Sequence, residues 1–192
     1  MKAIATICND GFSGLLDLWY LQLRNITSMP IFVLCLDGFI PEKKDGMQII
    51  EVNSDGNPFP TDLPDFACVE KLRLFEHLPE NVTSVFFLDL DVLVLRNFWD
   101  EKKYFEESLQ RLVICPDTFV GYKEKMEDEF RPYDSDFRMK FNADGSYFYF
   151  NTGVFFASRS LHGKMFPKFL FIWKDYVNSQ GKLPSVFDQN LV

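Results

Sequence analysis

Two aspartates, Asp89 and Asp91, follow a run of apolar residues, 85–88. The run shows no alternation of polar and apolar residues, which predicts a strand buried on both faces, as in parallel sheets. A carboxylate at the end of such a strand is costly to bury unless a cation or hydrogen bonds compensate its charge. Because side chains alternate along an extended chain, both carboxylates are expected on one side, where they could bind one divalent cation. Oxygen ligands suit Mn²⁺ and Mg²⁺, so the pattern favours a metal site over the alternative of two acids that cap a turn.

The composition indicates what kind of protein would hold this site. The 192 residues are 47% hydrophobic and 25% charged, which is ordinary for a globular protein with one core. We therefore expect a single domain over residues 1–192, which can also be a fragment of a longer chain with further domains C-terminal to it. The net charge of −8 argues against nucleic acid as a partner. It still allows a phosphate ligand, because a bound metal supplies positive charge locally.

The four cysteines are far apart in the sequence and form no Cys-x-x-Cys pair. This usage predicts reduced, buried thiols and a reducing compartment, hence a cytoplasmic protein. No apolar stretch has the length of a membrane span or the pattern of a signal peptide, so we expect no transmembrane segment. The cysteines are Cys8, Cys35, Cys68 and Cys115.

The order of the predicted elements indicates an α/β domain with a largely parallel sheet. Strands are expected in the run that leads to Asp89 and at residues 3–8, 31–36, 47–52 and 111–115. Helices are expected after an N-cap at Ser13, over residues 65–78, and after a cap at Ser158 or Ser160. Residues 117–146 are charged and aromatic with weak periodicity, which predicts a surface excursion of the kind that contacts an acceptor.

Polar side chains gather near the expected carboxyl ends of strands, where ligands bind in open α/β sheets. Besides the two aspartates, these clusters lie at residues 6–10, at Asn151 with Thr152, and at Asp188 with Gln189. Each of the last two also has a structural explanation when taken alone. Residues 151–153 suit a bulge or turn, and Asp188 with Gln189 suits the start of a solvated helix.

Several motifs together resemble one family. Residues 87–94, Phe-Leu-Asp-Leu-Asp-Val-Leu-Val, resemble the acid-x-acid motif of GT-A glycosyltransferases. Residues 150–155, Phe-Asn-Thr-Gly-Val-Phe, resemble an element of the glycogenin-like, retaining branch, and residues 187–189, Phe-Asp-Gln, are similar to that branch's Asp-Gln element. Lys71-Leu72 resembles a Lys-Leu pair of that branch. The first ten residues also resemble the N-terminal domain of multidomain glycosyltransferases of chlorella viruses.

The resemblance implies a single domain of the α/β, GT-A (Rossmann-like) class, with a mostly parallel central sheet flanked by helices. It implies transfer of a hexose or deoxyhexose, with retention at the anomeric carbon, from a UDP-sugar to a glycan or glycoprotein acceptor. The cofactor implied is Mn²⁺ or Mg²⁺. A viral member would act in the cytoplasm of its host.

The resemblance also assigns roles to the residues around the donor nucleotide. Asp89 and Asp91 would bind the metal, and Asp89 would also lie near the donor ribose. Lys71 would contact the donor phosphate or sugar, although a lysine on a helix is more often a residue that only packs its stem against apolar surface. Uridine would be held at the strand end formed by Thr6, Cys8 and Asn9.

The remaining roles concern the sugar. Asn151 and Thr152 would shape the sugar and acceptor pocket. Asp188 would bind a donor hydroxyl, and Gln189 would lie near the anomeric carbon. Family members usually supply a third metal ligand, a histidine, and a phosphate-contacting lysine beyond the Asp-Gln element. Neither His77 nor His162 matches that histidine, so both are expected to be ordinary surface or boundary residues, and the metal shell stays incomplete.

Other function classes fit the residues less well. An aspartate-nucleophile phosphatase also places Asp-x-Asp after an apolar strand, but it usually has Thr or Val where this chain has Leu93. A sugar-nucleotide pyrophosphorylase would need a Gly-rich, basic N-terminal loop, which residues 9–14 match poorly. A domain that binds nucleotide sugars without turnover stays open as the non-enzymatic alternative.

Overall fold

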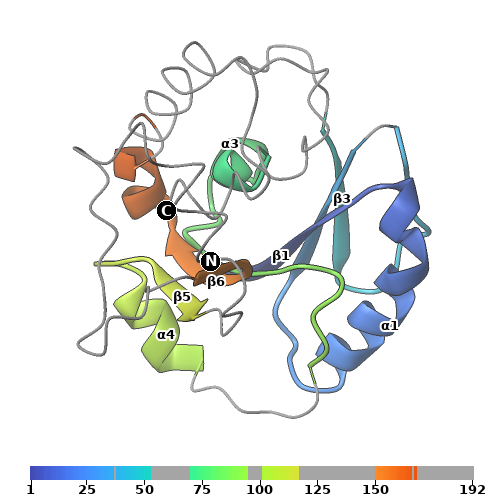
Figure 1. Ribbon diagram of the computed structural model, residues 1–192, viewed down its shortest axis with the longest axis horizontal. Helices are drawn as coiled ribbons and strands as arrows, with labels where there is room; N and C mark the ends of the chain where they lie inside the picture. Colours follow the sequence, from blue (N-terminus) through green and yellow to red (C-terminus); the bar gives the residue numbers. More distant parts are fainter. Residues whose placement is uncertain (37, 53–69, 95–100, 117–149, 166, 168–192) are drawn as a thin grey trace, which may run out of the picture.

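The computed structural model describes residues 1–36, 38–52, 70–94, 101–116, 150–165 and 167. Predictions outside these ranges concern Cys68, the surface excursion at residues 117–146, the end of the last helix, and the Asp188-Gln189 pair. Within the described ranges, the polypeptide forms a mixed α/β structure around one sheet (Figure 1).

The sheet has six strands in the order β3-β2-β1-β4-β6-β5. Strands β1, β2, β3 and β4 run parallel to one another, whereas β6 runs antiparallel to its two neighbours, β4 and β5. The predicted mostly parallel sheet is therefore confirmed. The strands are β1 (Lys2–Cys8), β2 (Ile31–Cys35), β3 (Met47–Glu51), β4 (Ser84–Leu88), β5 (Val113–Pro116) and β6 (Phe150–Ser158).

Each face of the sheet packs against helices (Figure 1). On one face, helix α1 (Ser13–Arg24) inserts Leu16 and Trp19 into a cluster that also contains Phe105 of helix α4 (Glu101–Glu107). On the other face, helix α3 (Leu74–His77) contributes Leu74 and Phe75 to a second cluster. These two clusters explain why the strands read as continuous apolar runs, because a parallel sheet covered on both sides has no polar face.

Strand β4 is buried along its whole length, as the apolar run before Asp89 predicts. Its phenylalanines pack against those of the antiparallel neighbour β6. Phe86 stacks on Phe156 with ring centroids 4.1 Å apart, and Phe87 stacks on Phe155 at 4.9 Å. Such cross-strand aromatic pairs help to fix the register of two strands, and here they hold β6 beside the end of β4.

The start of α1 differs from the prediction. A short 3-10 turn, η1 (Asp10–Phe12), comes between β1 and α1, and the N-cap residue of α1 is Phe12. Ser13 is the first helical residue, and its hydroxyl donates a hydrogen bond to the carbonyl of Asp10 at 2.7 Å. Asn9 caps the 3-10 turn instead, since its Oδ1 accepts a hydrogen bond from the backbone N–H of Phe12. The predicted cap at Ser13 is therefore wrong.

Two other predicted helix signals can be compared with the structure. Ser158 caps the helix that follows β6, because its Oγ accepts a hydrogen bond from the backbone N–H of Leu161 at 3.3 Å. The helix predicted over residues 65–78 is described from residue 70 onwards. It is helical at residues 70–72, makes a turn at Arg73, and continues as the four-residue α3.

The described cysteine thiols agree with the prediction of reduced, buried residues. Cys8 and Cys35 are free and buried, on adjacent strands in register with one another. Burial raises the pKa of the Cys8 thiol to about 11 and that of Cys35 to about 12, so both are protonated at neutral pH. Among the helices that the structure describes, none has the length and apolar character needed to cross a bilayer.

Candidate donor and metal site

The chain turns at the end of β4. The strand ends at Leu88, and the backbone N–H of Val92 donates a hydrogen bond to the carbonyl of Asp89 at 3.2 Å. Such an i to i+3 bond closes a turn over residues 89–92. The expectation that Asp89 and Asp91 lie on one side of an extended chain is therefore wrong in its premise. Asp91 is an exposed turn residue, whereas Asp89 is partly buried at the strand end.

Lys71 contacts the first of these acids directly. Its Nζ lies 2.8 Å from Oδ2 of Asp89, with 11% of the lysine side chain and 30% of the aspartate side chain exposed. The ammonium also lies 5.6 Å from the ring centroid of Phe87, within the range of a cation–π contact. The pairing neutralises a carboxylate that would otherwise be costly at the end of a buried strand. Lys71 thus does more than pack its stem, because its ammonium pairs with Asp89; its contact with a donor stays a prediction.

Strand β6 brings a second motif to the same point. The backbone N–H of Asp89 donates a hydrogen bond to the carbonyl of Gly153 at 2.8 Å, which continues the pairing of Leu88 with Val154. Thr152 is buried next to this glycine. The pairing of β6 with β5 is irregular here, because the register shifts between Ile114 and Cys115, in line with the bulge or turn that is the structural alternative for residues 151–153. The Asn-Thr-Gly motif therefore lies beside the aspartate. It lies at the amino end of β6, however, so its expected place at the carboxyl end of a strand is wrong; it reaches this edge because β6 runs antiparallel to β4.

The carboxyl end of β1 lies at the same edge, because β1 is the parallel neighbour of β4. The side chains of Thr6 and Cys8 are 0% and 1% exposed, whereas Asn9 is partly exposed. A nucleotide at this strand end would reach Asn9 and not the side chains of Thr6 and Cys8. The Thr6 hydroxyl is also buried with no hydrogen-bond partner among the described residues.

The other predicted sugar-site residues are not placed by the structure. Asn151 lies on β6 with its backbone opposite Cys115 of β5, and its side chain is outside the described part of the structure. Asp188 and Gln189 both lie outside the described residues. Their assignment to the sugar therefore stays a prediction.

The two histidines are structural contacts at the boundary of the core, in line with the expectation. His77 hydrogen-bonds to the buried carboxylate of Glu70. Nε2 of His162 hydrogen-bonds to the carbonyl of Leu72, and because a carbonyl only accepts, this nitrogen carries the proton. Burial lowers the pKa of His162 below its ordinary value of 6.5, although the bond to Leu72 opposes this shift. Neither histidine is near enough to form a metal cluster with other candidate ligands among the described residues.

Sequence reasoning missed a buried charged cluster around Glu70, the residue that precedes Lys71. Glu70 is 0% exposed, and its carboxylate binds both His77 and Arg73. The distance from Oε1 of Glu70 to Nη1 of Arg73 is 3.1 Å. The spacing of Glu70, Arg73 and His77 at i, i+3 and i+7 is a helical-face pattern that could have indicated such a cluster. Its burial, however, depends on packing that no local pattern reveals.

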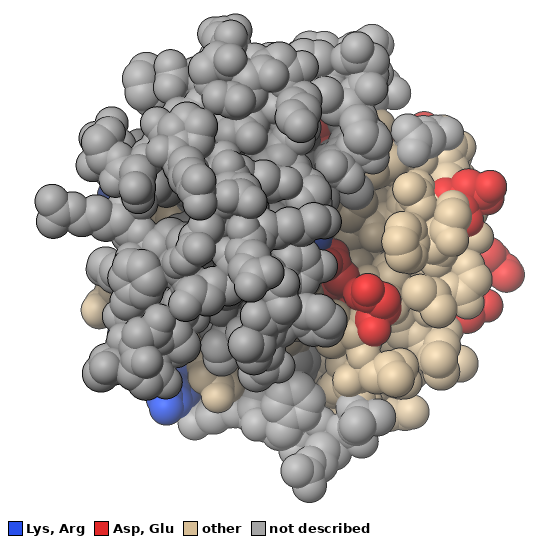
Figure 2. Space-filling view, in the orientation of Figure 1, with Lys and Arg blue, Asp and Glu red and all other residues tan. Residues whose placement is uncertain are grey.

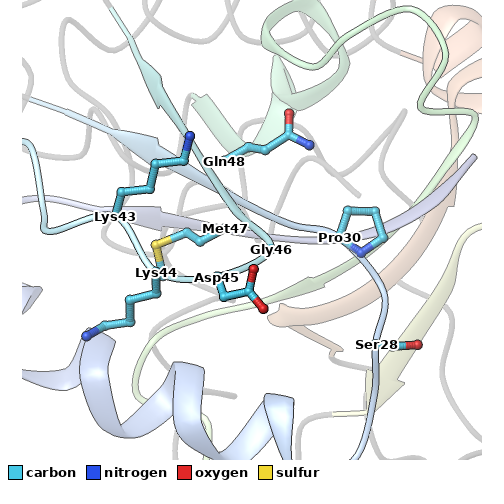
Figure 3. A pocket seen from close by; sticks show the side chains of 8 residues that line it. All are labelled: Ser28, Pro30, Lys43, Lys44, Asp45, Gly46, Met47 and Gln48. Atoms are coloured by element: carbon cyan, nitrogen blue, oxygen red, sulfur yellow. The ribbon is translucent and has the colours of Figure 1, made fainter.

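An open pocket lies at the opposite edge of the sheet (Figure 3). Its lining includes Pro30, just before β2, and Gly46, just before β3, so it faces the amino ends of these parallel strands. Figure 3 shows Lys44 extending away toward α1, where its Nζ pairs with Asp17 at 2.9 Å. This pocket is separate from the site at Asp89. On the face shown in Figure 2, the described surface carries several acidic side chains and few basic ones, in line with the net charge.

Comparison with known proteins bears on the fold. No protein-family model matches the sequence, and none of the curated proteins does. The chain matches the crystal structure of the galactosyltransferase LgtC in complex with donor and acceptor sugar analogues. The TM-score is 0.65 and the sequence identity 22%, over 100% of this chain and 69% of that chain. An active-site mutant of LgtC matches with a TM-score of 0.63 and 22% identity, over 100% of this chain and 68% of that one.

These matches confirm the predicted GT-A class of fold, with its mostly parallel central sheet and flanking helices. They leave the narrower resemblance, to the glycogenin-like branch and to the chlorella virus enzymes, as a prediction. The chain therefore has the architecture of a GT-A glycosyltransferase, with Asp89, Lys71 and the Thr152-Gly153 pair gathered at one strand edge.

Proposed function

We propose that this protein is a metal-dependent glycosyltransferase that uses a UDP-sugar donor. The observation that carries the proposal is the Lys71–Asp89 pair at the carboxyl end of β4, in a fold similar to that of a galactosyltransferase. In open α/β sheets this edge is where ligands bind. A lysine and two aspartates there provide what a metal-bound diphosphate needs, namely an ammonium for phosphate oxygens and carboxylates for a cation.

The chemistry of the side chains fits a hard cation bound together with a diphosphate. Asp89 and Asp91 offer carboxylate oxygens, which suit Mn²⁺ or Mg²⁺. Within the described part of the chain no group of three or more His, Cys, Asp or Glu side chains is arranged to hold a metal. Such a shell would be completed by diphosphate oxygens and water. When bound, the cation would stabilise the negative charge of the departing diphosphate.

The chain's own residues would act on the donor by positioning and charge. Lys71 would exchange its contact with Asp89 for the donor phosphate or sugar, and Asn9 would meet the uridine at the end of β1. Thr152, beside Asp89, would shape the sugar pocket together with Asn151. Because the leaving diphosphate gains negative charge in the transition state, a lysine held at this point lowers the barrier more than it tightens ground-state binding.

The narrower features follow from the resemblance in sequence. We propose transfer of a hexose or deoxyhexose, with retention, to a glycan or glycoprotein acceptor, and Asp188 with Gln189 as donor-hydroxyl and anomeric-carbon residues. The cytoplasmic location and the relation to viral enzymes are proposals of the same kind. The alternative of a nucleotide-sugar-binding domain without turnover is favoured by one observation, the absence of a third acidic or histidine ligand among the described residues.

Turnover separates the two functions. UDP release from a panel of UDP-sugars with Mn²⁺, with and without glycan acceptors, would be measured for the wild-type protein and for Asp91→Ala. We expect release from at least one UDP-sugar, even as slow hydrolysis, and its loss in Asp91→Ala. Tight binding of UDP with Mn²⁺ but no release from any donor would favour the binding domain and exclude the enzyme.

A further inference from the structure

Among the described residues, the helical segment that carries Lys71 is interrupted by a turn at Arg73, two residues after the lysine. Helical residues 70–72 are followed by a turn at Arg73 and by α3, which has only four residues. Isolated helices of this length are unstable in water, because nucleation is costly and few hydrogen bonds follow. Contacts with the rest of the protein therefore help to determine where Lys71 lies.

One such contact set starts from the residue before Lys71. The Glu70 side chain is 0% exposed, and its carboxylate accepts hydrogen bonds from Arg73 and His77. A buried carboxylate is tolerated only when it is paired and hydrogen-bonded. These bonds join both parts of the interrupted helix, because Glu70 lies before the turn at Arg73 and His77 lies at the end of α3.

A second contact set holds the residue after Lys71. The carbonyl of Leu72 accepts a hydrogen bond from His162, whose ring also packs against Phe75 at a centroid distance of 5.1 Å. His162 lies in the helical segment that follows β6. In the same segment, Arg159 donates hydrogen bonds to the carbonyls of Phe75 and Leu78 at 2.6 and 2.9 Å.

Strand β6 and the helical segment that follows it therefore contact Asp89 and the residue that follows Lys71. On β6, the carbonyl of Gly153 accepts a hydrogen bond from the backbone N–H of Asp89. In the helical segment after β6, His162 binds the carbonyl of Leu72, next to Lys71. A lysine ammonium sits on a flexible four-carbon stem, so it reaches a defined point only when its backbone is fixed on both sides. Here that point is 2.8 Å from Asp89 Oδ2.

We propose that Glu70 and His162 are positioning residues that fix the backbone on either side of Lys71, so that its ammonium stays beside Asp89 and within reach of a bound diphosphate, and that they thereby set the affinity of the site for the nucleotide of its donor. The part of this inference that concerns donor affinity rests on the proposed function, whereas the part that concerns the position of Lys71 does not. Neither residue contacts the reacting atoms; both act through Lys71.

The positioning is tested on the free protein by the reactivity of Lys71. An amine-reactive ester labels lysines, and mass spectrometry of the resulting peptides gives the rate at each one. We expect Glu70→Gln and His162→Phe to raise the labelling rate of Lys71 by at least about fivefold, the equilibrium factor of a contact worth one kilocalorie per mole. The phenylalanine keeps a ring against Phe75 but lacks the N–H. Exposed Lys43, at the opposite edge, is the internal reference.

The matched control variant is Arg111→Gln. It breaks another ion pair of the same length, 2.8 Å from Arg111 to Glu107, which lies on the exposed surface next to α4. Its Lys71 labelling rate should equal that of the wild type. An unchanged rate in both Glu70→Gln and His162→Phe would overturn the positioning, whether or not the protein binds UDP. Using two variants guards against one of them failing to fold, which circular dichroism would reveal.

The effect on donor affinity is tested by a double-mutant cycle. UDP affinity with Mn²⁺ would be measured for the wild type, Glu70→Gln, Lys71→Met and the double variant. If Glu70 acts through Lys71, Glu70→Gln weakens binding at least about fivefold alone but less than about twofold in the Lys71→Met background. Equal losses in both backgrounds would overturn the inference. Absence of UDP binding by the wild type would instead refute the proposed function, while the labelling result would still decide the positioning.

Discussion

The Lys71–Asp89 pair gives a quantitative prediction about stability. Exposed ion pairs contribute about 0–1 kcal/mol, whereas removing one partner of a fully buried pair costs about 3–5 kcal/mol. This pair lies between the two cases, because 11% of Lys71 and 30% of Asp89 is exposed and the charged atoms are 2.8 Å apart. We therefore expect a coupling free energy of about 1–2 kcal/mol, a factor of roughly 5–30 in the folding equilibrium.

The assay is a double-mutant cycle on the free energy of unfolding, in urea with a chelator present. The four proteins are the wild type, Lys71→Met, Asp89→Asn and the double variant. Tryptophan fluorescence follows the transition, because Trp19 is 1% exposed in the core and becomes exposed on unfolding. The coupling is what remains after the two single effects are subtracted from the double effect.

A second pair in the same protein provides the control. Lys44 and Asp17 are 2.9 Å apart, nearly the same distance, but 73% of the Asp17 side chain is exposed. Solvent and salt screen such a pair, so its coupling should be clearly smaller and should shrink further at high salt. The reasoning would be refuted if the Lys71–Asp89 coupling were no larger than that of the Lys44–Asp17 pair.

Three further predictions concern single groups. Thr6→Val should stabilise the protein by about 1 kcal/mol in urea unfolding, because it removes a buried hydroxyl that lacks a partner among the described residues, and it should leave UDP affinity unchanged; destabilisation or weaker UDP binding would contradict this. Since the pKa of His162 is lowered by burial, its contribution to stability is complete above pH 6.5 and declines as the pH falls below that value. Urea midpoints should therefore drop from pH 7.5 to 5.5, and drop less in His162→Phe. With pKa values raised to about 11 and 12, Cys8 and Cys35 should react with thiol reagents only after unfolding, and their stabilising effect should be lost as the pH rises above 9; fast labelling of the folded protein would contradict their burial.

The parts of the fold that the sequence predicted well are those that local patterns determine. The unbroken apolar run before Asp89 has one simple explanation, a strand covered on both faces, and β4 is such a strand. The direction of β6 had no comparable signal, because a buried strand looks the same in sequence whether it runs parallel or antiparallel to its neighbour. Its direction is determined by pairing with β4, which is a long-range property.

The details of the site show the same limit. Side chains two apart lie on one side only where the strand continues, whereas β4 ends at Leu88 and the chain turns before Asp91. Whether the two carboxylates share one side of a strand depends on the residue at which the strand ends, and no sequence pattern predicts a strand end to within one residue. The Lys71–Asp89 contact joins residues that are 18 apart in sequence, so no local pattern predicts it. Lys71 is indicated only by the resemblance to a family.

The most direct test of the proposed site is a calorimetric titration of UDP with and without Mn²⁺, on the wild-type protein and on Asp91→Ala. Asp91 suits this test because it is an exposed turn residue, so its replacement should leave the fold intact. If Asp89 and Asp91 bind a cation that bridges to the diphosphate, Mn²⁺ should strengthen UDP binding by the wild type, and most of this gain should be lost in Asp91→Ala. Equal UDP affinity in all four titrations would contradict a metal-bridged nucleotide site at the end of β4.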